Sequence, residues 1–330
     1  MGEDSLRIGL IGLGSMGRHH ARVIRATPGM ELVAVADPGG DRFGVAGPLP
    51  LLPDVEALIG VGLDAAVVAV PTIHHEEVAL ALARAGVHAL VEKPIAHCSR
   101  AGRRVADAFA ERGLVGAVGY VERCNPALRA LRERLDAGEL GQVYQVLTRR
   151  QGPFPARISD VGVVKDLATH DIDLTAWVAG AHYESVHARV AYRSGRENED
   201  MVLATGRLTN GVIVSHTVNW LTPFKERVTV VTGEKGAFVA DTLTGDLTFH
   251  ANGTVASTWD QVAAFRGVSE GDVIRYAIPK REPLALEQEH FRDAVLGTGN
   301  EAVTMADGVA TLIVVEAILA SASENRVVEI

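Results

Sequence analysis

Short apolar segments alternate with amphipathic segments along the first 120 residues of the chain. Near-continuous apolar runs predict strands at 7–11, 31–36, 65–70, 87–91 and 115–119. Apolar residues at helical spacing predict helices at 16–26, 76–85 and 99–111. Buried strands separated by helices are typical of a parallel sheet that is covered on both faces. The stretch 38–51 is rich in Gly and Pro, so we expect a shortened second crossover.

The pattern changes after about residue 126. A charged helix is predicted at 127–135, and strands are predicted at 143–150, 185–192, 202–208, 212–220 and 227–232. Further helices are predicted at 167–178, 286–296 and 305–320. Strands that follow one another without helices indicate a mostly antiparallel sheet. We therefore predict an α/β protein, with an N-terminal doubly wound parallel sheet and a C-terminal α+β domain.

Composition narrows the class of protein. The chain has 330 residues, enough for two domains, and its net charge of −9 argues against a nucleic-acid partner. The two cysteines, Cys98 and Cys124, show no zinc-site spacing. No signal-peptide pattern opens the chain and the apolar stretches fall short of a membrane span. We therefore expect a cytoplasmic protein without a membrane partner.

A glycine-rich loop follows the first predicted strand and opens the first predicted helix. Its sequence, Gly12-Leu13-Gly14-Ser15-Met16-Gly17, fits a dinucleotide-binding turn in a strand-helix-strand unit. Gly12 would allow the tight turn, Gly14 a close approach to the pyrophosphate, and Gly17 close packing of helix on strand. Backbone N–H groups near Ser15 and Met16 would face the phosphates. The alternative is that the glycines serve the tight turn alone.

Asp37 lies 20 residues after Gly17, at the end of the second predicted strand. A carboxylate at this place would hold a ribose diol and repel a 2′-phosphate, which favours NAD over NADP. Arg42 could still reach the ribose, so NADP stays open.

Two further loops follow parallel strands and should lie at the same edge of the sheet, where open α/β folds bind ligands. They are the segments 70–74 and 92–94. Cofactor contacts are expected from Pro71, Thr72, His74, Glu92, Lys93 and Tyr120. His75 is expected to begin a helix in solvent, and His19 and His20 are interpreted as structural.

The glycine loop, Glu92-Lys93-Pro94 and the pair Asp166…His170 together resemble the family of glucose-fructose oxidoreductase and inositol dehydrogenase (Gfo/Idh/MocA), over essentially the whole chain. Segments 120–126, 149–155, 162–167 and 170–173 are similar to its branch of UDP-N-acetylglucosamine 3-dehydrogenases. The resemblance implies a Rossmann domain for NAD at 1–124. It also implies a substrate-binding and oligomerisation domain at 125–330, whose last helices could pack back on the first domain, and a homodimer or homotetramer.

The resemblance assigns the chemistry to Lys93, Asp166 and His170. Alcohol oxidation needs a base for the hydroxyl proton, and a histidine can serve near neutral pH. We expect His170 as the acid/base, with Lys93 bonded to the reacting hydroxyl and Asp166 orienting the sugar. At i and i+4, Asp166 and His170 would share one helix face. One alternative is that Lys93 is the base. The other is that Lys93 and His170 are ordinary exposed side chains without a catalytic role.

A metal site built from Asp166, His170, Asp171 and Asp173 is the competing interpretation. Asp171 and Asp173 would point away from the face that carries Asp166 and His170, and no second histidine is linked to it. We therefore expect no metal.

Substrate contacts are expected from Lys93, Asn125, Arg149, Arg157, Lys165, Asp166 and His170. Arg149, Arg150 and Arg157 would form a cationic group for a nucleotide diphosphate, although ordinary surface arginines are the alternative. The substrate site could be lined by residues 220, 222, 225 and 227. Packing within the sheet explains Trp220 equally well.

The predicted function is NAD-dependent oxidation of a secondary sugar hydroxyl, at C3 of a UDP-N-acetylhexosamine. The partner is then a small sugar or nucleotide sugar. The alternatives are a dehydrogenase of inositol, an aminoglycoside or another free sugar, and a non-catalytic regulator that senses the cofactor. The sequence does not fix the direction of the reaction.

Overall fold

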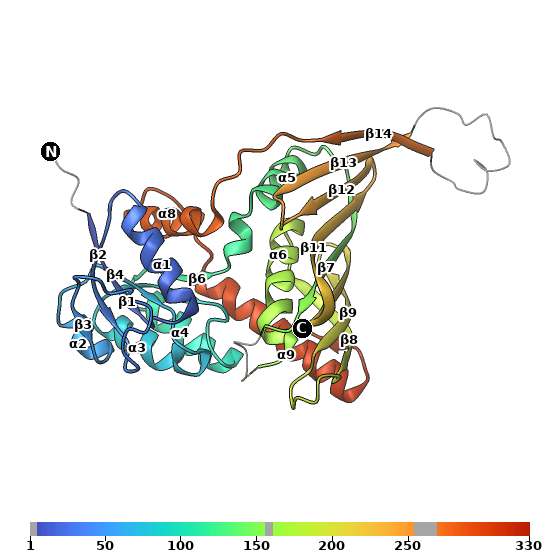
Figure 1. Cartoon of the computed structure of the whole chain (residues 1–330). Helices are drawn as coiled ribbons and strands as arrows, with labels where there is room; N and C mark the ends of the chain where they lie inside the picture. The colour runs from blue at the N-terminus through green and yellow to red at the C-terminus, as the bar shows by residue number, and fades with distance from the viewer. Residues whose placement is uncertain (1–4, 156–160, 254–268) are drawn as a thin grey trace. The chain divides into compact units, whose positions relative to one another are not determined.

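A computed structural model describes residues 5–155, 161–253 and 269–330 (Figure 1). The chain forms two compact units. The first comprises Met1–Val121 and Glu282–Ile313, and the second comprises Glu122–Arg281 and Val314–Ile330. The chain therefore returns to the first unit after completing most of the second. Its last crossing lies inside helix α9 (Met305–Glu324).

The first unit contains a six-stranded sheet of order β3-β2-β1-β4-β5-β6, with every pair parallel. The strands are β1 (Leu6–Ile11), β2 (Met30–Ala36), β3 (Leu51–Leu52), β4 (Ala65–Val68), β5 (His88–Glu92) and β6 (Gly116–Gly119). This order is that of a doubly wound Rossmann fold, with the change of direction between β1 and β4. The predicted α/β fold class is thus confirmed for this part of the chain.

Alternate residues of β4 explain why the apolar run forms a central strand. Ala66 and Val68 join one buried cluster, while Ala65 and Val67 join another. Successive side chains of a strand point to opposite faces, so a strand buried on both faces reads as a continuous apolar run. The helices of this unit are α1 (Ser15–Ala26), α2 (Val55–Ile59), α3 (His75–Arg84), α4 (Ser99–Ala110), α8 (Pro283–Val295) and the start of α9.

The second unit is built on a nine-stranded sheet of order β14-β13-β12-β11-β7-β10-β9-β8-β15. The strands are β7 (Val143–Pro153), β8 (Tyr183–Ala191), β9 (Met201–Leu208), β10 (Ile213–Asn219), β11 (Leu221–Gly233), β12 (Gly236–Asp241), β13 (Asp246–Gly253), β14 (Ser269–Arg275) and β15 (Val328–Glu329). The pairs are antiparallel except β7 with β10. The predicted mostly antiparallel sheet is confirmed, and strands β12 to β15 were not foreseen.

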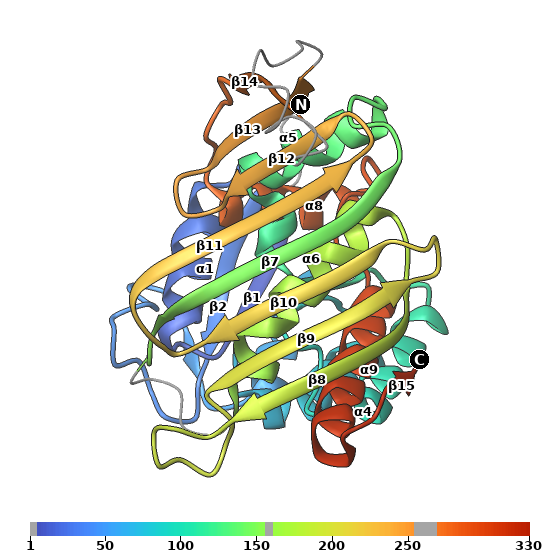
Figure 2. The same cartoon turned by 90° about the vertical axis from the view of Figure 1, so that its right-hand side faces the viewer.

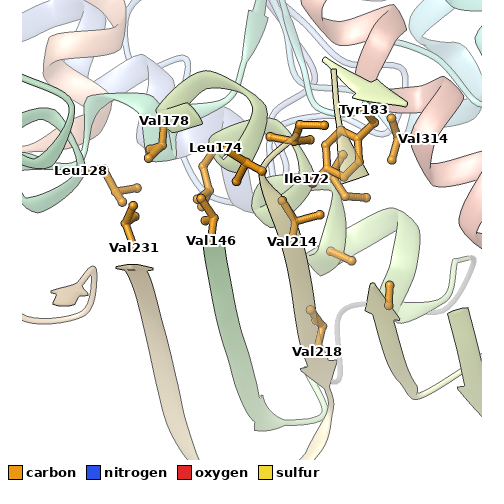
Figure 3. Packing of buried hydrophobic residues seen from close by; sticks show 14 of the residues in the cluster. Leu128, Val146, Ile172, Leu174, Val178, Tyr183, Val214, Val218, Val231 and Val314 are labelled. Atoms are coloured by element: carbon orange, nitrogen blue, oxygen red, sulfur yellow. The ribbon is translucent and has the colours of Figure 1, made fainter. Parts of the chain in front are cut away.

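Helices α5 (Pro126–Asp136) and α6 (Thr169–Ala179) lie on one face of this sheet. Apolar side chains from the strands and from the helices meet there in one cluster (Figure 3). Figure 3 labels Val146, Val214, Val218 and Val231 from strands, and Ile172, Leu174 and Val178 from α6. Figure 2 shows the opposite face, which no helix covers in the described part of the chain. This open face is therefore the outer face of the second unit.

Helix α9 has the length and apolar composition of a membrane span, with a mean hydropathy of 1.7 over the best 18 residues. The apolar pattern of the sequence predicted no such stretch. Within the protein, 56% of that window is buried, as in the core helices of globular proteins. Length and composition are therefore weak evidence for a membrane segment here.

Helix α8 carries a buried carboxyl group in the first unit. Glu287 is 6% exposed, and neither of its oxygens has a hydrogen-bond partner among the residues that the structure describes. Burial raises the pKa of Glu287 well above its ordinary value of 4.5, and the nearby Glu92 adds to this. The folded protein therefore keeps a proton on Glu287 at pH values where the unfolded chain releases it.

This difference predicts that Glu287 makes the protein less stable as the pH rises above 4.5. Each pH unit between the unfolded and folded pKa costs about 1.4 kcal/mol. Glu287→Gln keeps the shape and removes the titration. We expect the melting temperature of this variant to exceed that of the unaltered protein at pH 8, with a smaller difference at pH 5.5. Glu31→Gln, at an exposed position of β2, is the control, and a difference independent of pH would contradict the prediction.

Candidate functional site

The glycine loop joins β1 to α1 at the carboxyl edge of the first sheet. Gly12 has a φ of +91°, and a Cβ there would lie 2.5 Å from the carbonyl oxygen of Ala69. A Cβ on Gly17 would lie 1.9 Å from the carbonyl oxygen of Gly12. A Cβ on Gly14 would meet nothing within 4 Å. The first and third glycines are thus needed for the turn itself, whereas Gly14 leaves open space in front of the backbone.

Helix α1 begins at this open space. Its first turn holds no acidic residue, and Ser15 is exposed while Met16 is half-buried. The N–H groups of a first helical turn lack partners within the helix and carry the positive end of its dipole. The residues therefore fit a dinucleotide, whose pyrophosphate would lie against the N–H groups of the α1 terminus.

The carboxylate of Asp37 lies against the same loop. It accepts hydrogen bonds from the backbone N–H of Leu13 at 2.8 Å and of Gly39 at 2.7 Å. These bonds fix an acidic side chain beside the glycine loop, as the sequence spacing predicted. Arg42 is exposed on the following loop, and a role for it toward a 2′-phosphate stays a prediction.

The segment that follows β4 forms a short 3₁₀ turn, η1 (Thr72–His74). Pro71 and His74 are exposed and Thr72 is half-buried, so all three remain candidates for contact with a ligand at this edge. The expectation for His75 was wrong. His75 does begin α3, but it is 1% exposed, and its ring nitrogens lie 2.8 Å from the carbonyl oxygen of Pro94 and 2.9 Å from that of Val70.

Glu92 is the last residue of β5, and Lys93 and Pro94, joined by a cis peptide bond, follow it. Lys93 is half-buried. Glu92 is 9% exposed, and its Oε1 lies 2.7 Å from Nε2 of His20 while its Oε2 accepts a hydrogen bond from the N–H of Lys93 at 3.1 Å. Burial opposes ionisation of Glu92, but His20 and Lys93 outweigh it and lower the pKa of this carboxyl. The carboxylate of Glu92 is thus engaged inside the unit, and its predicted contact with the cofactor stays a prediction.

Tyr120 is fully buried within an apolar cluster of the first unit, so its predicted contact with the cofactor also stays a prediction. Asn125 immediately precedes α5 in the second unit. Its Oδ1 accepts from the N–H of Ala127 at 3.0 Å and its Nδ2 donates to the carbonyl of Thr242 at 3.0 Å. These bonds make Asn125 a helix cap, and they engage both ends of the amide that was expected to meet substrate.

Asp166 lies just before helix α6 of the second unit, and His170 lies in its first turn. The sequence predicted a regular helix there, but residues Val164–Ala168 form a π-helical turn, η3, before α6 begins at Thr169. The π turn changes the angle between positions i and i+4, so the simple shared face of an α-helix does not apply. Asp166 is 6% exposed and His170 is half-buried. Such turns occur often at functional sites, because they displace side chains from regular helical spacing.

A buried ion-pair network, absent from the sequence analysis, lies between α6 and the sheet. Arg150 on β7 is 3% exposed and donates through Nε to Asp171 at 3.0 Å and through Nη1 to Glu122 at 2.8 Å. Nη1 of Arg227 on β11 lies 3.7 Å from the same carboxyl of Glu122. Burial raises the pKa of Asp171 to about 6 against the attraction of Arg150, and Glu122 adds to the rise. The network ties the first turn of α6 to two central strands.

Arg150 does not belong to the cationic group that was expected to bind a diphosphate. Arg149 and Arg150 are neighbours on a strand, so they point to opposite faces of the sheet. Arg150 is buried beneath α6, whereas Arg149 is exposed and pairs with Glu226 at 3.0 Å. Arg157 lies outside the described residues. Lys165 is half-buried on η3, and its predicted contact with substrate stays a prediction.

The acidic residues after His170 have partners of their own. Asp171 meets Arg150, and Asp173 accepts from Arg123 at 2.9 and 2.6 Å. Among residues 5–155, 161–253 and 269–330, no cluster of three or more His, Cys, Asp and Glu has the geometry of a metal site. These carboxylates therefore serve to hold helix α6.

Contacts within the second unit account for part of the set 220, 222, 225 and 227, which was expected to line the substrate site. Trp220 is 3% exposed and stacks edge-on against Phe154, with ring centroids 5.3 Å apart. The hydroxyl of Thr222 donates to Oδ1 of Asn219 at 2.8 Å. Lys225 is exposed. Arg227, which reaches Glu122, is the member of this set that belongs to the network beneath α6.

Comparisons with known proteins match a described family to each of the two units. Residues 6–120 match the family described as "Oxidoreductase family, NAD-binding Rossmann fold". Residues 128–239 match the one described as "GFO/IDH/MocA C-terminal domain".

Full-length relatives are dehydrogenases. A UDP-N-acetylglucosamine 3-dehydrogenase of Acidithiobacillus ferrooxidans is 32% identical over 325 residues, which cover 98% of this chain and 96% of the relative. The scyllo-inositol 2-dehydrogenase (NAD(+)) of Bacillus subtilis is 27% identical over 326 residues, covering 94% and 92%. A solved structure of the A. ferrooxidans UDP-N-acetylglucosamine 3-dehydrogenase superposes with a TM-score of 0.83 at 27% identity, covering 97% of this chain and 98% of that chain. The family matches and the full-length similarity agree with the glycine loop and sheet order, and this chain belongs to the Gfo/Idh/MocA family of NAD-binding oxidoreductases.

Proposed function

We propose that this NAD-dependent dehydrogenase oxidises the C3 hydroxyl of a UDP-linked N-acetylhexosamine to a ketone. The proposal is carried by the presence of Lys93 in the Glu92–Pro94 turn together with Asp166 on the π turn η3 and His170 in the first turn of α6. The relative that is 32% identical over nearly the whole chain bears the name of this activity. The cytoplasm is the proposed location, and a nucleotide sugar is the proposed small-molecule partner.

Each of the three side chains has a distinct role in the proposed reaction. His170 takes the proton from the C3 hydroxyl as the carbon–hydrogen bond breaks. The ammonium of Lys93 donates a hydrogen bond to the same oxygen and stabilises the developing alkoxide. Asp166 accepts a hydrogen bond from the sugar and so orients it. NAD, held by the glycine loop and Asp37, would supply the acceptor for the hydride of C3. The proton remains on His170 until solvent removes it.

Oxidation of inositol or another free sugar is the second candidate, and two observations favour it. One relative that matches 94% of this chain is an inositol dehydrogenase. The burial of Arg150 also removes one of the three arginines expected to hold a diphosphate. A regulator that only senses the cofactor would have no need for Lys93, Asp166 and His170 together.

A substrate panel separates these candidates. We expect NADH formation, followed at 340 nm, with UDP-N-acetylglucosamine or its C4 epimer, and little or none with myo-inositol, scyllo-inositol or free N-acetylglucosamine. Turnover confined to the inositols would establish the second candidate instead. No turnover with any of them, together with tight NAD binding, would favour the regulator.

Removal of Lys93 tests the proposed chemistry directly. Lys93→Met should lower kcat by about 10²–10³-fold, the usual cost of losing one donor to a developing oxyanion. The Kd of NADH, measured by fluorescence, should change little because the glycine loop and Asp37 are intact. Lys235→Met, at an exposed lysine of the second unit, is the matched control. Normal turnover of Lys93→Met would refute the proposed site.

Asp37 is expected to set the choice of cofactor. Asp37→Asn keeps a side-chain acceptor for the N–H of Leu13 and removes the charge. The loss of a charged hydrogen bond to the ribose should lower kcat/KM for NAD by about 10-fold or more. Use of NADP should improve, since the repulsion of a 2′-phosphate is gone. Unchanged ratios of kcat/KM for the two cofactors would contradict this assignment.

We also propose that the outer face of the second sheet joins subunits into a homodimer or homotetramer. Apolar side chains stand on this face at outward-pointing positions, and Leu203 and Ile213 are each about half exposed, at 50% and 49%. Leu147 and Val230 lie on the same face of neighbouring strands. Apolar residues gathered on an open sheet favour association.

Charge on this face should separate the subunits. Leu203→Glu combined with Ile213→Lys is expected to give a monomer in light scattering, whereas the parent protein elutes as a dimer or tetramer. Leu296→Glu, at a residue of the first unit that is equally exposed, should leave the assembly intact. A parent protein that is already monomeric would refute the proposed interface.

A further inference from the structure

Two buried imidazoles meet the Glu92–Pro94 turn within the first unit. His20 comes from α1 and is 0% exposed, and His75 comes from the start of α3 and is 1% exposed. Neither takes part in the proposed proton or hydride transfer. A buried imidazole is costly unless its polar atoms are bonded, so the partners of these two rings show what each ring holds.

His75 spans two loops at the carboxyl edge of the sheet. One ring nitrogen, Nδ1, lies 2.8 Å from the carbonyl oxygen of Pro94, just after β5. The other, Nε2, lies 2.9 Å from the carbonyl oxygen of Val70, just after β4. Burial lowers the pKa of His75, so the ring is neutral near pH 7 and donates to one carbonyl at a time. The tautomer with hydrogen on Nδ1 bonds the start of α3 to the carbonyl of Pro94, beside Lys93, whereas the other tautomer bonds it to the loop after β4.

His20 acts on the other end of the turn. The side-chain amide of Gln288 on α8 donates to Nδ1 of His20 at 3.0 Å. Nε2 of His20 then donates to Oε1 of Glu92 at 2.7 Å. The second oxygen of Glu92 accepts from the backbone N–H of Lys93 at 3.1 Å. A chain of hydrogen bonds thus runs from α8 through α1 to the backbone of Lys93.

We propose that His20 and His75 are positioning residues for Lys93, each fixing one end of the turn that aims the lysine side chain. The proposal rests on the proposed function, in which the Lys93 ammonium meets the reacting oxygen. Loops at a sheet edge have few neighbours to restrain them, and a displacement of about 1 Å at a reacting group can cost about 10²-fold in rate. Two bonded rings, anchored on separate helices, restrict such displacement.

The test uses paired substitutions in the full-length protein. His75→Phe and His20→Leu fill the space without the hydrogen bonds, while His75→Gln and His20→Gln keep one donor. We expect kcat to fall by about 30- to 100-fold in the apolar variants, with the Kd of NADH and the KM of the sugar changing by less than about 3-fold. The Gln variants should recover most of the lost rate. They also keep the test decisive if an apolar variant fails to fold.

A double-mutant cycle with Lys93→Met shows whether the two rings act through the lysine. Residual rates are measured by single turnover at saturating enzyme. If His75 and His20 act by aiming Lys93, His75→Phe and His20→Leu should slow Lys93→Met by less than about 3-fold further. Full additivity would overturn the positioning role. Normal turnover of Lys93→Met alone would instead overturn the proposed function, so the two failures are distinct.

His88 provides the matched control. It lies at the opposite end of β5, and its Nδ1 accepts from the N–H of Val115 at 2.8 Å. His88→Phe removes a comparable bond of an imidazole to the backbone far along the strand from Lys93. We expect a lower melting temperature with kcat unchanged. A fall in kcat equal to that of His75→Phe would show that any loosening of this sheet slows the reaction, and the inference would be wrong.

Discussion

The guanidinium of Arg150 is buried beneath α6, and the arrangement of the second unit follows from the need to pair it. An unpaired buried charge costs several kcal/mol, so carboxylates from other elements have to meet it. Asp171 does so from α6 and Glu122 from the segment that opens the unit. These bonds tie the helix that carries His170 to the central strand β7. The helix of the proposed acid/base His170 is thus held by charges that take no part in the proposed chemistry.

In the first unit the main constraint is the shape of the glycine loop, and backbone geometry satisfies it. A dinucleotide needs N–H groups at the surface of a turn that is too tight for side chains, and Gly12 and Gly17 provide this turn. The neighbouring loops are held by polar side chains that reach across the sheet edge. Asp37 bonds the glycine loop, and the ring of His75 lies between the carbonyls of the loops after β4 and β5 and donates to one of them. Binding and positioning are therefore concentrated at the carboxyl ends of parallel strands, where such loops converge.

Membership of an NAD-binding family and the identity of the substrate rest on different parts of the molecule. The glycine loop, Asp37 and Lys93 belong to the first unit, and we propose that they set the cofactor and the class of reaction. Residues expected to recognise a sugar belong to the second unit, and two of them have partners within the protein. Arg150 is an internal ion-pair partner and Asn125 caps a helix. These changes weaken the case for a diphosphate more than the case for a sugar alcohol.

The amino-acid sequence by itself determined the strand and helix pattern of the first unit except β3 and α2, the glycine loop with its acidic partner, and the family motifs. Periodicity and short motifs express local geometry, so they can be read within a few residues. It did not reveal the roles of His20 and His75, the burial of Arg150 or the π turn before α6. The bonded residues are far apart in the sequence. His20 and Glu92 are 72 residues apart, Arg150 and Asp171 are 21 apart, and Gln288 and His20 are 268 apart. Only the tertiary structure decided them, because a buried polar side chain takes its role from the partner that folding brings to it.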